Sequence, residues 1–344
     1  MLTADPGQKE KCRGIGDENQ ALLDGTGPVG DILSMPAPRR SKSPGPSQLV
    51  FALDSPLITR VQNDRNVMAF PWFSLAKIVR STPIEYRDRR VELTVAPGPA
   101  GLPTAWDKEF LVYVVSLMAQ KLERGESVER TFTFAAADFF RVAGIGASGR
   151  SYERIEGALD RLQSVSIRTN IETGGELTKG FFSWLDEAEM VYRDTGEVDR
   201  DGAPVRVLDR VTVTVCRWLW RAVQADRQLY AYDPRFFDLP PLEQRLYEIA
   251  RAHCGKAGFR MWLDRLQACV GSEDRPAKFK AKLVEIAQRR QPLPGYGFIL
   301  QEKAVHNTGA RGRPAKRVMV AFYSTRADSI TRAIGEAVES PIVD

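Results

Sequence analysis

Apolar residues recur along this chain at two spacings, which predict two similar series of helices and strands. Spacings of three and four residues indicate helices, and alternation with a period of two indicates strands. In the first series we expect helices over 105–122, 135–144 and 149–165, and strands over 90–98, 130–135, 166–192 and 209–220. The stretch 166–192 reads as paired strands around a Gly-Gly turn, and 209–220 turns helical near its end.

The second series repeats this order. Pro240-Pro241 opens a first helix, Trp262 and Leu266 mark a second that ends at Gly271, and a third covers 275–290. Strands over 296–304 and 317–324 follow, joined by a basic loop. Three helices and two strands around a basic loop are typical of a winged helix, a helix-turn-helix with an added β-hairpin.

The fold class we predict is therefore α+β, with two tandem winged-helix domains behind a disordered N-terminal tail. Residues 1–47 are rich in Gly, Pro and Ser, and they lack the apolar residues needed to offset their ordering entropy. The predicted divisions are this tail, a first domain over 48–225, a second domain over 226–330, and a C-terminal tail over 331–344.

Composition favours a cytoplasmic protein. No apolar run approaches the ~18 residues that cross a membrane, and charged residues interrupt any signal-peptide core near the N-terminus. The four cysteines are scattered, without a C-x-x-C pair, so we expect reduced thiols.

Positive charge is concentrated in one part of the chain. The net charge of +5 is small, but residues 255–317 hold fourteen basic residues against five acidic ones. A polyanionic partner is expected for this block, the alternative being a solvated surface. The basic residues are Lys256, Arg260, Arg265, Arg275, Lys278, Lys280, Lys282, Arg289, Arg290, Lys303, Arg311, Arg313, Lys316 and Arg317.

The stretch GIGASGRS, residues 144–151, resembles the phosphate-binding loop G-x-x-x-x-G-K-[ST], with Arg150 in place of Lys. Such a loop must follow a strand, whereas this stretch follows a predicted helix that ends at Gly144. We therefore predict the turn of a helix-turn-helix and no nucleotide site.

The helix after this turn is the candidate DNA-reading helix of the first domain. Arg150, Arg154 and Arg161 fall opposite its apolar face, and Ser151 lies at the helix N-terminus, which favours anions. Arginine reads guanine or clamps phosphates. The alternative is a solvated helix whose arginines pair with Glu153, Glu156 and Asp160.

The third helix of the second domain is the stronger candidate. Lys278, Lys282 and Arg289 form one stripe, interrupted only by Glu285, and Arg275 lies at the helix N-terminus. We expect this helix to carry most of the DNA contacts.

The loop between the last two strands contains Arg311-Gly312-Arg313-Pro314, extended by Lys316 and Arg317. This tetrapeptide resembles the core of an AT-hook, whose arginines enter the narrow minor groove of A·T-rich DNA. The alternative is a flexible, soluble loop.

No enzyme signature is present. The two histidines, His253 and His306, lie far apart, which excludes the His-hydrophobic-His metal motif of rolling-circle nickases. No H-E-x-x-H or G-x-S-x-G occurs, and Asp186, Glu187 and Glu189 read as a surface cluster. We expect no catalysis, no cofactor and no metal.

Three stretches resemble plasmid replication initiators of the RepA type, also called replication initiator protein A. They are FPWFSLAK (70–77), TAWDKEFLVYVVSLMAQKLERGE (104–126) and SGRSYERIEGALDRL (148–162). With the two-domain order, the likeness covers roughly residues 48–325.

The resemblance implies tandem winged helices that bind direct repeats, called iterons, at a plasmid origin. It further implies opening of an A·T-rich flank, loading of the host replicative helicase with the host initiator, and a monomer–homodimer equilibrium through the first domain. DNA-reading roles would fall on 149–165, 275–290 and the loop 309–317.

Two alternatives remain at this stage. A transcriptional repressor of the same fold would bind its operator without opening any duplex. An ATP-driven helicase loader would need a functional phosphate-binding loop.

Overall fold

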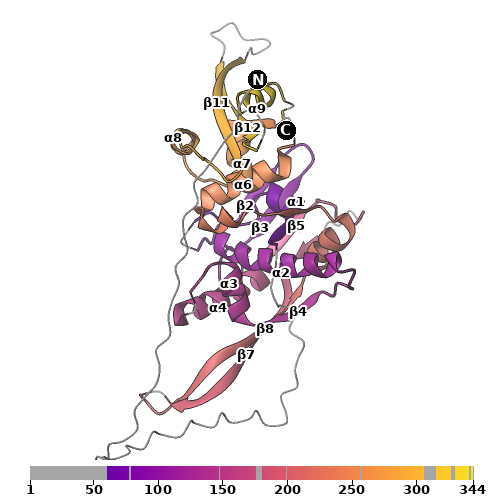
Figure 1. The fold of residues 1–344 in the computed structure, drawn as a ribbon, viewed down its shortest axis with the longest axis vertical. Helices are drawn as coiled ribbons and strands as arrows, with labels where there is room; N and C mark the ends of the chain where they lie inside the picture. Colours follow the sequence, from indigo (N-terminus) through magenta and orange to yellow (C-terminus); the bar gives the residue numbers. More distant parts are fainter. Residues whose placement is uncertain are drawn as a thin grey trace, which may run out of the picture. The chain divides into compact units, whose positions relative to one another are not determined.

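A computed structural model describes residues 60–76, 79–146, 148–175, 180–198, 200–255, 258–305, 315–326, 330–340 and 342–343. Within these ranges the fold is mixed α+β (Figure 1). The predicted N-terminal tail lies outside the described residues.

Six elements in the middle of the chain form what we call the first module. Its three-stranded antiparallel sheet has the order β4-β8-β7. The elements are α2 (Ala105–Glu123), β4 (Thr131–Phe134), α3 (Ala136–Val142), α4 (Gly149–Ser164), β7 (Leu185–Val198) and β8 (Pro204–Val215).

Six later elements, which we call the second module, follow in the same order. Their antiparallel sheet has the order β10-β12-β11, so the last strand is again central. The two modules thus share one order of elements and one sheet topology. The elements are α6 (Pro241–His253), β10 (Phe259–Trp262), α7 (Leu263–Val270), α8 (Pro276–Ala287), β11 (Tyr296–Val305) and β12 (Ala315–Ser324).

The remaining elements surround the modules. Strands β2, β3, β5 and β6 form an antiparallel sheet in that order, β1 pairs with β9, and α9 packs against β12. The elements are β1 (Gln62–Asp64), α1 (Arg65–Ala69), β2 (Ile84–Arg87), β3 (Glu92–Ala96), β5 (Ser166–Thr169), β6 (Gly180–Phe182), α5 (Arg217–Arg221), the π-turn Ala222–Asp226, β9 (Leu229–Ala231), the 3-10 turn Pro234–Asp238 and α9 (Ile330–Glu339).

Three expected elements differ in the structure. The strands expected to pair around the Gly-Gly turn do so, as β5 with β6, but the later part of 166–192 belongs to another sheet, in which β7 pairs with β8. The first-module hairpin is longer than expected, since β7 runs on to Val198. Trp262, expected in a helix, ends strand β10 and precedes α7.

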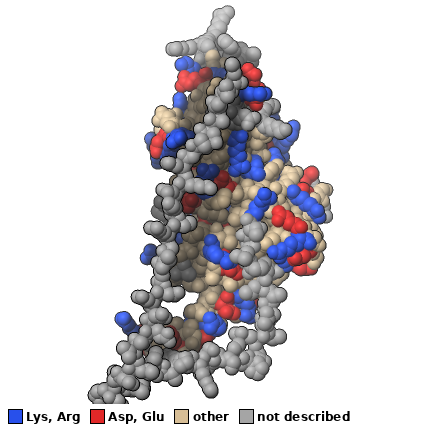
Figure 2. Space-filling view, in the orientation of Figure 1, with Lys and Arg blue, Asp and Glu red and all other residues tan. Residues whose placement is uncertain are grey.

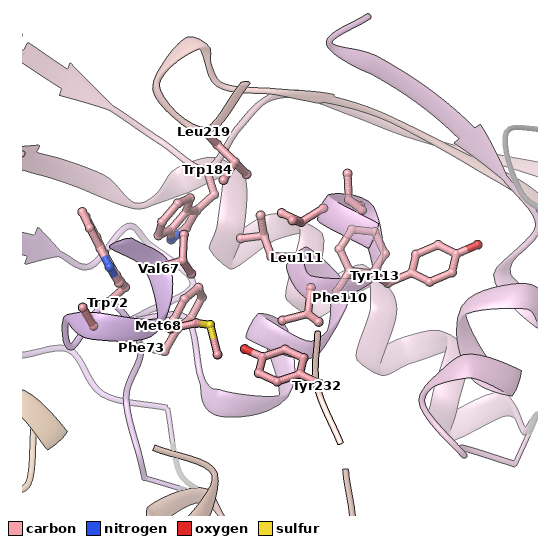
Figure 3. Close-up of a cluster of buried hydrophobic side chains, with 14 of the residues drawn as sticks. Val67, Met68, Trp72, Phe73, Phe110, Leu111, Tyr113, Trp184, Leu219 and Tyr232 are labelled. Carbon is pink, nitrogen blue, oxygen red and sulfur yellow. The ribbon is translucent and has the colours of Figure 1, made fainter. Parts of the chain in front are cut away.

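Thirteen of the first fifteen residues of helix α2 are buried, so it is the central helix and not a half-exposed one. Phe110, Leu111 and Tyr113 of α2 lie in an apolar cluster with Met68 and the indole of Trp184 (Figure 3). Asp107 and Lys108 of the same helix are also buried. Charged groups at such depth require ionic partners.

The partner of Lys108 is Glu248 of α6. One carboxylate oxygen of Glu248 accepts hydrogen bonds from Lys108 Nζ at 3.0 Å and from Arg245 Nη1 at 2.8 Å. The other accepts from the Tyr232 hydroxyl at 2.6 Å. The side chains of Lys108, Arg245 and Glu248 are at most 2% exposed. Burial lowers the pKa of the Lys108 ammonium, while Glu248 acts in the opposite direction.

Arg245 extends this network to two more helices. Its guanidinium donates to the carbonyl oxygens of Met68 in α1 at 2.7 Å and of Cys269 in α7 at 2.8 Å. The Glu248 network therefore connects the first helix of each module, and it also ties α1 and α7 to them.

Two ion pairs nearer the surface join the second module to the segments that flank β2. Arg265 of α7 pairs with Asp88 after β2, and Arg80 pairs with Glu273 at 2.5 Å. The second module is therefore tied to α2 of the first module by the buried Lys108–Glu248 pair, and to the segments that flank β2 by the two outer pairs.

We expect Glu248→Gln to lower the free energy of unfolding by about 3–5 kcal/mol, because Lys108 and Arg245 then lose the buried carboxylate that pairs with them. Denaturant unfolding followed by circular dichroism measures the change. Glu92→Gln is the matched control, since it breaks only an exposed pair with Arg87 and should cost less than about 1 kcal/mol. Equal losses for both variants would contradict this role of the network.

Candidate nucleic-acid interface

Two lysines of α8 converge on one carboxylate. Asp274 precedes the helix, and it accepts hydrogen bonds from Lys278 Nζ at 3.0 Å and from Lys282 Nζ at 2.5 Å. These lysines are 67% and 44% exposed, so their ammonium groups remain accessible. Hydrogen bonds from Lys282 and then from Lys278 lower the pKa of Asp274.

A second carboxylate joins α8 to the β11–β12 hairpin. Glu302 of β11 accepts from Lys280 of α8 at 3.2 Å and from Lys316 of β12 at 3.3 Å. Arg317 of β12 pairs with Asp264 at 2.8 Å, and its guanidinium lies 4.3 Å from the ring centroid of Trp262. The third helix and the hairpin thus form one charged surface.

The ends of α8 carry two further predicted residues. Arg275 is the N-cap and is exposed. Arg289 lies just beyond the helix, where it donates to Glu243 at 2.8 Å and to Glu285 at 3.3 Å. Its side chain lines a cleft between α8 and the start of α6, as does that of Lys282. Arg289 is 45% exposed, much as Lys282 is, but it lies beyond the end of α8 and pairs with Glu243 of α6.

The loop residues Arg311 and Arg313 lie outside the described residues. The described strands approach this loop from Val305 and Ala315, which are paired in register. The AT-hook resemblance therefore stays a prediction from sequence.

The stretch 144–151 connects α3 to α4, and no strand precedes it. Gly144 has a φ of +67°, the left-handed region that glycine adopts without strain. Ser148 caps α4 by accepting from the backbone of Ser151. A turn between two helices does not fit a phosphate-binding loop, which follows a strand.

The predicted DNA-facing residues of α4 have different surroundings. Arg150 is exposed, whereas Ser151 is buried and donates its hydroxyl to the Gly146 carbonyl at 2.7 Å. The Arg154 guanidinium stacks 4.3 Å from the centre of the Trp106 ring. Ser151 therefore shapes the turn. Among the described residues neither Arg150 nor Arg154 forms an ion pair, and Arg154 is held by the Trp106 ring.

Arg161 requires a correction. Its guanidinium binds both carboxylate oxygens of Asp107, at 2.7 and 2.8 Å, and its side chain is 16% exposed. Asp107 also closes a capping box with Thr104 at the start of α2. The hydrogen bonds to Asp107 raise the pKa of Arg161. Arg161 therefore holds α4 against α2, and the prediction that it faces DNA is wrong.

Charge differs sharply between the two modules. The described residues of 258–326 contain twelve basic residues and five acidic ones. Helix α4 carries three of each, and the described part of the β7–β8 hairpin has four basic and seven acidic residues. The cationic surface therefore lies on the second module, and even there carboxylates are interspersed with lysines and arginines. Figure 2 shows such mixing of blue and red side chains on the face in view.

Sequence reasoning missed the carboxylates that hold these cations. A local signal existed for Asp274, which lies four and eight residues before Lys278 and Lys282. None existed for Glu302, because its lysines come from distant parts of the chain.

Among the described residues, no group of three or more His, Cys, Asp or Glu side chains could hold a metal ion. No helix in the same part of the chain is long and apolar enough to span a bilayer.

Comparisons with known proteins point in one direction. A model of the family Replication initiator protein A matches residues 62–298. A protein of Wigglesworthia glossinidia brevipalpis, named as a candidate replication protein, is 27% identical over 252 residues, which cover 72% of this chain and 88% of that protein.

The crystal structure of domains 2 and 3 of RctB is similar in fold. It superposes with a TM-score of 0.51 at 14% sequence identity, over 75% of this chain and 97% of the RctB chain. Because the family model covers more than half of the sequence, this chain is a member of the replication initiator protein A family.

Proposed function

We propose that this protein is a non-enzymatic replication initiator that binds repeated sites at an origin, chiefly through its second module. The observation that carries the proposal is the cationic surface formed by α8 and the β11–β12 hairpin. In this view the two modules are tandem winged helices, and α8 is the helix that enters the major groove.

The charge pattern supports phosphate binding by this surface. The twelve basic residues outnumber the acidic ones by seven over the described part of the second module. Exposed ion pairs such as Lys278–Asp274 contribute about 0–1 kcal/mol, so a phosphate can replace the carboxylate at small cost. Release of counterions from DNA then supplies affinity that falls steeply with salt.

Base reading would come from the residues nearest the groove. Arg275 at the N-terminus of α8 and the exposed Lys278 are the best-placed candidates, because recognition helices contact bases near their N-termini. Arg311 and Arg313 would enter the adjacent minor groove, where A·T-rich sequence narrows it.

The first module has a smaller part in DNA binding. Arg150 and Arg154 would contact phosphates beside the main site, since the acidic residues of α4 and of its hairpin oppose closer approach. The Glu248 network holds both modules in a fixed arrangement. A fixed arrangement avoids the entropy cost of ordering a flexible linker on DNA.

The remaining steps follow the family resemblance. We propose that binding occurs at origin iterons, that an A·T-rich flank opens, and that the host initiator and replicative helicase are recruited. A monomer–homodimer equilibrium through the first domain would regulate the amount of active protein. The competing function is a repressor of the same fold, which would bind DNA and leave the duplex closed.

Permanganate oxidation of unpaired thymines separates the initiator from the repressor. With supercoiled plasmid carrying the cognate origin, host initiator and this protein, we expect new thymine reactivity in the A·T-rich flank. Footprinting on the same plasmid verifies occupancy of the repeats. Full occupancy without any reactive thymine would favour the repressor.

Neutralising Lys278 and Lys282 together tests whether α8 contacts DNA. We expect Lys278→Gln/Lys282→Gln to weaken duplex binding and to flatten the plot of log affinity against log salt by about one to two units. Fluorescence anisotropy across a salt series measures both. A slope equal to that of the wild-type chain would show that this helix does not contact DNA.

Arg150 and Arg161 lie on the same helix, and the structure gives them opposite roles. We expect Arg150→Ala to weaken DNA binding with little change in stability. Arg161→Ala should lower the unfolding free energy by about 3 kcal/mol or more, because Asp107 loses its buried partner. Denaturant unfolding and anisotropy on both variants measure the two effects. Equal stability of the variants would contradict the structural role of Arg161.

A further inference from the structure

Four lysines of the second module are held in pairs by two carboxylates. Asp274 accepts from Lys278 and Lys282 on α8, and Glu302 accepts from Lys280 and Lys316. In each case both carboxylate oxygens are used, one for each ammonium group. A phosphodiester can be bound in the same way, with one ammonium group on each of its two free oxygens.

The backbone of Asp274 is firmly placed. Gln267 of α7 donates its side-chain amide to the Asp274 carbonyl at 2.5 Å, and the Asp274 amide donates to the Ser272 hydroxyl at 3.3 Å. The Asp274 side chain is only 16% exposed, whereas that of Lys278 is 67% exposed. The Asp274 backbone is therefore held in place, and the lysines are the more exposed partners of its carboxylate.

Glu302 has a comparable position on a rigid element. It lies within β11, where its residue pairs in register with Val318 of β12. Its two lysines come from different elements, α8 and β12, so the carboxylate also fixes the helix relative to the hairpin.

We propose that Asp274 and Glu302 are internal competitors for DNA phosphate, which set the affinity of the second module and limit its binding to unrelated sequence. This inference rests on the proposed DNA binding. In the free protein each carboxylate occupies the place of a phosphate. On DNA the lysines exchange this carboxylate for a phosphodiester, and the fixed carboxylate then repels the backbone nearby.

The consequence for specificity follows from the two kinds of binding. Non-specific complexes depend almost entirely on phosphate neutralisation, whereas specific complexes also gain base contacts. The penalty acts once for each lysine placed on a phosphate, so its total is larger in non-specific complexes, where phosphates are the main contacts, than in specific complexes, where some of these lysines contact bases. Removing the carboxylates should strengthen binding to random sequence and lower the discrimination ratio.

The test uses the full chain with Asp274→Asn, Glu302→Gln and the double variant. The probes are a random-sequence duplex and a duplex selected by the wild-type chain, each titrated by anisotropy across a salt series. We expect each single variant to bind the random duplex about two- to fivefold more tightly, with a salt slope steeper by about one unit. The gain should be smaller on the selected duplex.

Glu336→Gln is the matched control, because it removes one negative charge from an i,i+4 pair with Arg332 on α9. Unfolding midpoints verify that all variants fold. Binding by the Asp274 and Glu302 variants that is weaker than or equal to that of the control would overturn the inference. Failure of the wild-type chain to bind either duplex would instead overturn the proposed function.

Discussion

The buried carboxylate of Glu248 is the interaction on which the arrangement of the modules depends. It lies where the central helix of the first module meets the first helix of the second, and it pairs with two cationic side chains that are at most 2% exposed. A buried charge that loses its partner is costly, so Lys108, Arg245 and Glu248 require one another. This requirement links α2 and α6, and Arg245 adds α1 and α7. The distance between the two candidate DNA-reading helices is therefore a property of the fold.

The two modules share a topology, but their surfaces differ in charge. Each has a central last strand and a long hairpin, yet the hairpin of the first is acidic and the described surface of the second is basic. Topology alone would assign DNA binding equally to both. Charge and ion pairing favour α8, where lysines remain accessible, over α4, where Arg161 and Ser151 serve the protein's own packing.

Structural elements that have a local signal in the sequence were predicted well. Helix α4 was expected over 149–165 and spans Gly149–Ser164, since its apolar spacing and the glycine turn before it are local signals. The short strands β2 and β10 were missed, although β4 of the same length was predicted; in β10, Trp262 was assigned to the helix that follows. The outer halves of β7 and β8, beyond Tyr192 and before Asp209, were also missed, although the two strands form a hairpin that is local in sequence.

The same distinction applies to the candidate interface. The basic stripe of α8 was readable from helical spacing, and Lys278 and Lys282 do lie together around Asp274. Arg161 is also basic and has a similar helical spacing on α4, but its partner Asp107 is fifty-four residues away in sequence. Spacing places a side chain on a face, and it does not say whether another helix already covers that face.

Lysine acetylation with and without duplex DNA tests the central claim most directly. Mass spectrometry would report the reactivity of each lysine in the intact chain. The account predicts that origin DNA protects Lys278, Lys282 and Lys316, while Lys121 of α2 reacts equally in both samples. Unchanged reactivity of the three second-module lysines in the DNA complex would contradict the account.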